Sequence, residues 1–86
     1  MVELDVTERG NVALYRDNSE ILWVLSGDRA ILEVSINSHN YPAWGVKEID
    51  ISVEDLAIHI NANLQGWFIR KSNIEGLNVS EQNRII

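Results

Sequence analysis

The chain contains no cysteine and a single proline, and its apolar runs are short. The absence of cysteine excludes a disulfide framework and thiolate metal ligands, and it fits a reducing compartment. No apolar run approaches the ~18 residues that a membrane-spanning helix needs. The first ten residues, MVELDVTERG, also lack the basic and then apolar pattern of a signal peptide. These absences predict a cytoplasmic protein without a membrane partner.

Cationic side chains are scarce as well. Seven Lys and Arg residues stand against thirteen Asp and Glu residues, which gives a formal net charge of −6. Nonspecific nucleic-acid binding depends largely on Lys and Arg that neutralise phosphates, so this balance argues against a nucleic-acid partner. It favours a basic partner, although modest acidity also serves simply to keep a small protein in solution.

The residues that metal binding and covalent catalysis require are equally few. The two histidines, His39 and His59, belong to separate expected elements, whereas a metal site uses three or four ligands. Asp55 and His59 have the spacing of an ordinary contact on a helix surface, and no nucleophile motif accompanies them. The sequence therefore predicts no catalytic residue, no metal and no cofactor, and we expect that the protein is not an enzyme.

What the chain does contain suits one small domain. Its 86 residues are 45% hydrophobic and 23% charged, which is typical of a folded globular chain. This length is near the small end of what one hydrophobic core can stabilise. We therefore expect a single domain over residues 1–86 with room for about one sheet and one helix.

The clearest pattern is a helix over about residues 52–65. Ser52 is a favourable N-cap, and Glu54 and Asp55 place negative charge at the positive end of the helix dipole. Gly66 supplies the residue that most easily closes a helix. One apolar stripe at helical spacing predicts a core-facing side, made of Val53, Leu56, Ala57, Ile60, Leu64 and Trp67.

Alternation of apolar and polar residues predicts strands over most of the remaining chain. Val2 to Val6 alternates and should open a first hairpin with residues 11–16. Residues 20–25 follow, then residues 30–36, in which Ala30 to Ile36 should alternate evenly, and residues 46–51 lead into the helix. Residues 67–70 fit a last strand or a continuation of the helix, and the pattern does not place residues 71–86.

These elements predict an α+β fold, an antiparallel meander of four or five strands with one main helix packed on one face. Residues 18–25 keep a rival interpretation, because Asp17 and Glu20 have the spacing of a capping box and could begin a short helix. We favour the strand, since β-branched and aromatic residues fill this run.

Two surfaces are candidates for partner binding. Ile58 falls outside the apolar stripe, on a helix flank that also carries Glu54 and Asn61, so an apolar side chain there has a polar rim. The second is the loop over residues 38–45, in which Tyr41 and Trp44 could contact a partner protein or a small molecule. The alternative for Trp44 is that it folds back as a lid on the core.

Residues 9–34, RGNVALYRDNSEILWVLSGDRAILEV, resemble the swapped-hairpin DNA-binding domain of the AbrB/MazE antitoxin family in the spacing from Gly10 to Gly27-Asp28-Arg29. The resemblance implies a swapped-hairpin β dimer in which Arg9, Asn11 and Arg16 are DNA contacts. The later stretch ISVEDLAIHI is similar to the acidic segment by which such antitoxins bind their toxins. The segment 52–67 would then be the toxin contact.

The function that these observations favour is that of a nonenzymatic module which binds another protein, as inhibitors, immunity proteins and antitoxins do. Two alternatives stay open, a dimeric DNA-binding regulator of the AbrB/MazE type and a small-molecule-binding domain. A homodimer is compatible with each of these functions.

Overall fold

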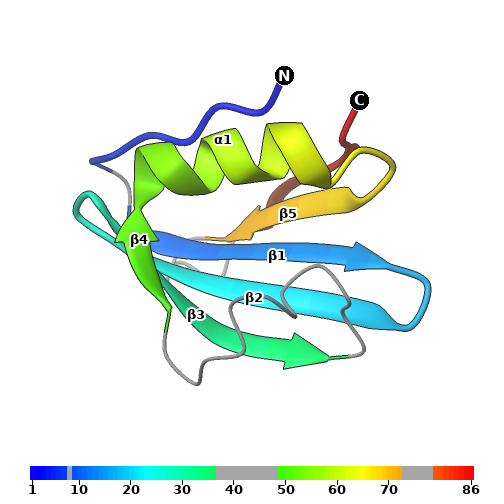
Figure 1. The fold of residues 1–86 in the computed structure, drawn as a ribbon, viewed down its shortest axis with the longest axis horizontal. Helices are drawn as coiled ribbons and strands as arrows, with labels where there is room; N and C mark the ends of the chain where they lie inside the picture. Colours follow the sequence, from blue (N-terminus) through cyan, green and yellow to red (C-terminus); the bar gives the residue numbers. More distant parts are fainter. Residues whose placement is uncertain (8, 37–48, 73–78) are drawn as a thin grey trace.

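The computed structural model describes residues 1–7, 9–36, 49–72 and 79–86, which form one six-stranded antiparallel sheet and one helix (Figure 1). The sheet order is β4-β3-β2-β1-β5-β6, and the helix α1 follows β4 in the chain. The α+β class is confirmed, with six strands where the sequence predicts four or five. The elements are β1 (Gly10–Arg16), β2 (Ser19–Ser26), β3 (Arg29–Ile36), β4 (Asp50–Ser52), α1 (Val53–Asn63), β5 (Phe68–Ser72) and β6 (Val79–Arg84).

The strands β1, β2 and β3 form two consecutive hairpins with two-residue turns. Arg16 pairs with Ser19 across the first turn, and Ser26 pairs with Arg29 across the second. Such turns need a residue with positive φ, which Asp17 supplies at φ 54° and Gly27 at φ 62°. Because β2 pairs with β1 on one side and β3 on the other, the rival prediction of a helix over residues 18–25 is wrong.

An irregularity interrupts the pairing of β2 with β3. Trp23 pairs with Leu32 while Leu22 pairs with Val34, so Glu33 is an extra residue of β3. An extra residue shifts the alternation of a strand from one face of the sheet to the other. The even register that the alternation from Ala30 to Ile36 predicts is therefore interrupted at Glu33 in the pairing with β2.

The helix begins where the sequence predicts and ends two residues earlier. The Ser52 hydroxyl accepts a hydrogen bond of 3.0 Å from the backbone N–H of Asp55, as an N-cap should. At the other end Leu64 is the C-cap, and Gly66 at φ 89° turns the chain into β5. The Gly66 N–H donates to the Ile85 carbonyl oxygen at 2.8 Å, which joins this turn to the residue after β6. The expected strand 46–51 is seen only as β4, because residues 46–48 lie outside the described residues.

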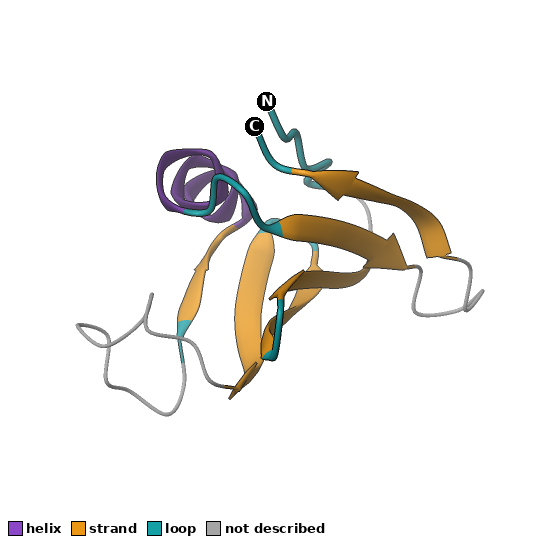
Figure 2. Cartoon of the chain, turned by 90° about the vertical axis from the view of Figure 1, so that its right-hand side faces the viewer, coloured by secondary structure: helices purple, strands orange, loops and turns teal. Residues whose placement is uncertain are grey.

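One apolar cluster joins the helix to the sheet, and Figure 2 shows α1 alongside the strands. The predicted stripe supplies Val53, Leu56, Ile60 and Leu64, each 0% exposed, whereas Ala57 is only half-buried. Trp23 is fully buried in β2. The other members of the cluster are Val12, Leu14, Ile21, Leu25, Ala30, Trp67, Ile69 and Ile85.

The chain before β1 is not part of the sheet. We call Met1–Val6 the N-terminal segment; β1 pairs with β2 and β5 instead, so the predicted first hairpin is wrong. The alternation in this segment has another cause, since Val2 and Leu4 are half-buried against the core cluster while Val6 is exposed. In Figure 1 the segment runs beside α1, with residue 1 near the end of the helix.

The end of the chain forms strands that the sequence leaves open or unplaced. Residues 68–72 form β5 beside β1, which decides between strand and helix for the stretch after Gly66. Part of the tail forms β6, which pairs with β5 from Phe68 opposite Arg84 to Ser72 opposite Val79.

Candidate functional site

The exposed flank of α1 has the phase that its sequence predicts. Ile58 is 59% exposed, whereas Ile60, two residues further along, is 0% exposed. Glu54, one turn before Ile58, is exposed as well, and Asn61 is half-buried. An apolar side chain thus lies at the surface of the helix, where its contact with water is unfavourable.

The N-terminal segment forms a second wall opposite this flank. Together they make an open groove of about 480 Å³, which we call the α1 groove. The three helix residues that the sequence predicts for a partner-binding surface all line it: Ile58, Glu54 and Asn61. The full lining is Met1, Val2, Glu3, Leu4, Val6, Glu54, Ala57, Ile58 and Asn61.

The α1 groove gathers apolar surface that is accessible to solvent. Among the described residues six large apolar side chains are exposed, and three of these, Met1 at 97%, Val6 at 46% and Ile58 at 59%, line this one groove. Single exposed apolar residues are common, whereas several around one groove make that groove a candidate for a binding surface. Sequence reasoning misses Met1 and Val6, because nothing local indicates that the N-terminal segment lies beside the helix.

The charged side chains of the α1 groove are acidic. They are Glu3 and Glu54. The positive group in the lining is the α-ammonium of Met1, which belongs to the backbone. The groove is therefore suited to an apolar group that is flanked by cations.

Asn61 fixes the N-terminal segment to the helix. Its carboxamide accepts from the Val2 N–H at 2.8 Å and donates to the Val2 carbonyl oxygen at 2.9 Å. The side chain thus pairs with Val2 as a neighbouring strand would. At this position Asn61 builds the wall of the groove, a role that the sequence does not indicate.

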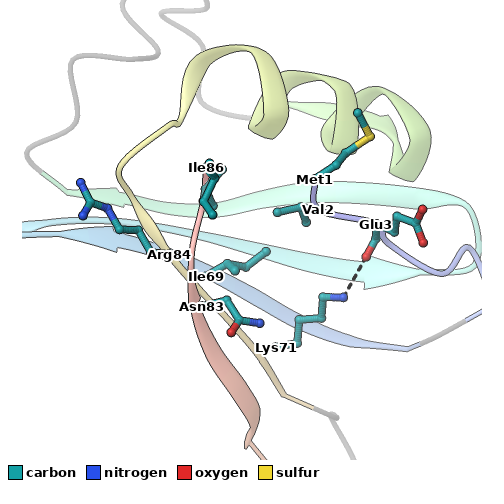
Figure 3. Close-up of a pocket in the computed structure, with 9 residues that line it drawn as sticks. Met1, Val2, Glu3, Ile69, Lys71, Asn83, Arg84 and Ile86 are labelled. Atoms are coloured by element: carbon teal, nitrogen blue, oxygen red, sulfur yellow. Dashed lines mark hydrogen bonds between the residues drawn. The ribbon is translucent and has the colours of Figure 1, made fainter.

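On its other side the N-terminal segment faces the strands β5 and β6 (Figure 3). Lys71 Nζ donates to the Glu3 carbonyl oxygen at 2.8 Å. The depression there is lined by residues of both charge signs, including Glu3, Lys71 and Arg84. Its sheet residue Ile69 is 4% exposed and offers little apolar surface. Met1 lines both this depression and the α1 groove, and Figure 3 shows its side chain extending toward α1.

His59 lies beside Asn63, with 3.2 Å between its Nδ1 and the Asn63 Nδ2. Burial lowers the pKa of the His59 imidazole, because the charged form loses hydration. In the part of the chain that the structure describes, no three or more His, Asp or Glu side chains gather as a metal site would require. No helix there is long and apolar enough to cross a membrane.

The other predicted site residues do not join the α1 groove. Tyr41 and Trp44 lie outside the described residues, as does the rest of the aromatic loop. Arg9 precedes β1 and Arg16 ends it, so these two exposed residues flank opposite ends of one strand. The Arg16 guanidinium lies 5.0 Å from the centre of the Trp67 ring.

Asn11, the third DNA contact that the family resemblance implies, is half-buried in β1 opposite Val24 and Ser72. Nearby, on β1 and β5, the rings of Tyr15 and Phe68 stack with centroids 5.6 Å apart. The guanidinium of Arg70 lies 5.9 Å from the Tyr15 ring centre. These aromatic groups already contact one another, which is how cross-strand pairs stabilise a sheet.

The fold and the site define an α+β domain with an acidic apolar groove between its helix and its N-terminal segment. Comparison with known proteins finds no family model, no curated sequence and no solved structure that matches the chain.

Proposed function

We propose that this chain is a nonenzymatic module that binds another protein through the α1 groove, in the manner of an inhibitor, immunity protein or antitoxin. The observation that carries the proposal is that three exposed apolar side chains from two separate parts of the sequence line one groove: Met1, Val6 and Ile58. Covering them with a partner removes apolar surface from water, at about 25 cal/mol for each Å².

The charge of the groove favours a basic partner. The charged side chains of its lining are Glu3 and Glu54, and the whole chain carries a net charge of −6. Such a surface attracts a positively charged protein during encounter and repels an acidic one. The proposed partner therefore presents an apolar side chain with Lys or Arg residues beside it.

The test compares three baits in a lysate of the source organism: wild type, Ile58→Glu and Ile86→Glu. The last is a matched control, because Ile86 is 96% exposed and lies outside the α1 groove, so it adds the same charge elsewhere. We expect a protein that wild type and Ile86→Glu both retain and Ile58→Glu does not. Titration calorimetry with the purified partner should then show a loss of about tenfold or more in affinity for Ile58→Glu, as for a central interface residue. A partner that binds all three baits equally contradicts the proposal.

A further inference from the structure

The backbone N–H and C=O of Leu4, in the N-terminal segment, offer the α1 groove a further means of recognition. In an extended chain the N–H and C=O of one residue point to the same side, and those of the next residue point to the opposite side. The Val2 pair bonds to Asn61 on α1, and the Glu3 carbonyl bonds to Lys71 on β5, on the opposite side. By this alternation we infer that the Leu4 pair points back toward α1, on the side of the groove that Leu4 lines.

The residue of α1 one turn before Asn61 has no polar group that could pair with Leu4. Ala57 lies one turn before Asn61 on the same flank, where a methyl group replaces the carboxamide that holds Val2. Among the described residues the N–H and C=O of Leu4 have no hydrogen-bond partner in the protein. A donor and an acceptor thus belong to a residue that lines the same groove as the exposed side chain of Ile58.

We propose that the α1 groove recognises a basic, apolar protein segment by pairing an amide of that segment with the backbone of Leu4. This inference rests on the proposed function and names the chemistry of the partner. The amide comes from a peptide bond or from an Asn or Gln side chain of the partner. The two hydrogen bonds between the Asn61 carboxamide and the Val2 backbone are the example for this pairing. An apolar side chain of the segment covers Ile58 and Val6, and its Lys or Arg residues lie near Glu3 and Glu54.

The position of Leu4 is tested without any partner by Ala57→Asn, which supplies a carboxamide one turn before Asn61. Its matched control is Ala62→Asn, which places the same residue at an exposed helix position outside the groove. Hydrogen exchange followed by NMR should show the Leu4 amide slowed by about fivefold in Ala57→Asn relative to Ala62→Asn, the factor for one net hydrogen bond. Equal exchange rates in the two variants overturn the placement of Leu4.

The ligand is tested with a random peptide display library that is selected on the wild-type chain. Enriched peptides should combine an apolar residue with an excess of Lys and Arg, and they should bind Ile58→Glu about tenfold more weakly. Ala57→Asn should weaken them as well, because it occupies the Leu4 backbone, whereas Ala62→Asn should not. A saturating concentration of peptide should slow hydrogen exchange of the wild-type Leu4 amide. Replacing each Asn or Gln of the peptide by Ala should abolish this slowing if a side-chain amide makes the bond, and should leave it unchanged if a peptide bond does.

The two proposals fail in different ways. Peptides that bind Ile58→Glu as tightly as wild type refute the proposed function itself. Peptides that need Ile58 but have no excess of basic residues, or that bind Ala57→Asn as tightly as Ala62→Asn, leave the proposed function standing and overturn the pairing with Leu4.

Discussion

Truncating the two isoleucines of α1 should lower stability by very different amounts. Ile60 is 0% exposed within the core cluster, and removing such a side chain to Ala costs about 2–5 kcal/mol in transfer and cavity terms. Ile58 is 59% exposed, so less than half of its surface is removed from water on folding. Full burial of an isoleucine contributes about 1.5–3 kcal/mol, which puts Ile58→Ala near 1 kcal/mol before the better helix propensity of Ala offsets part of it.

We therefore expect a decrease in the free energy of unfolding of about 3 kcal/mol for Ile60→Ala and about 0.5 kcal/mol for Ile58→Ala. A domain of this length has a total stability of roughly 4–13 kcal/mol, so the first change is a large share of it. Urea unfolding followed by tryptophan fluorescence measures both values, because Trp23 at 0% and Trp67 at 2% exposure are buried probes. If Ile58→Ala costs as much as Ile60→Ala, the helix phase is wrong and the α1 groove with it.

Three further outcomes follow from local geometry. Ser52→Ala should lower the free energy of unfolding by about 1 kcal/mol, because it removes the acceptor for the Asp55 N–H. Ser52→Asp should keep the stability of the wild type, since a carboxylate can accept the same bond, and thermal unfolding measures both variants. An equal loss of stability in the two variants argues against capping. Asp17→Gly should leave stability nearly unchanged, whereas Asp17→Val should lower the free energy of unfolding by about 1–3 kcal/mol, because φ 54° is strained for a β-branched residue. Equal melting temperatures for the two variants would contradict this expectation. Burial lowers the pKa of His59 in the folded protein, so unfolding takes up a proton at pH values between that pKa and 6.5. The free energy of unfolding should therefore rise with pH through this window. A His59 pKa at or above 6.5 by NMR titration, or a pH dependence that His59→Gln leaves unchanged, would refute this expectation.

The part of the candidate site on the helix is predictable because helical periodicity is local. Ile58 and Glu54 belong to the same flank whatever α1 packs against, and the structure agrees. The part on the N-terminal segment is not predictable in this way. Alternation in Val2 and Leu4 indicates one apolar side, but it does not tell whether that side contacts another strand or a helix.

Local features follow from the sequence alone: the N-cap at Ser52, the outward phase of Ile58 and the positions of both hairpin turns. Each depends on side chains within a few residues of one another. Tertiary contacts select strand over helix at residues 20–25, the six-strand order, the extra residue at Glu33, the place of β6 beside β5 and the hydrogen bonds of the N-terminal segment to Asn61. These contacts join residues far apart in the chain, and their selection depends on the packing of the whole core, which no local pattern encodes.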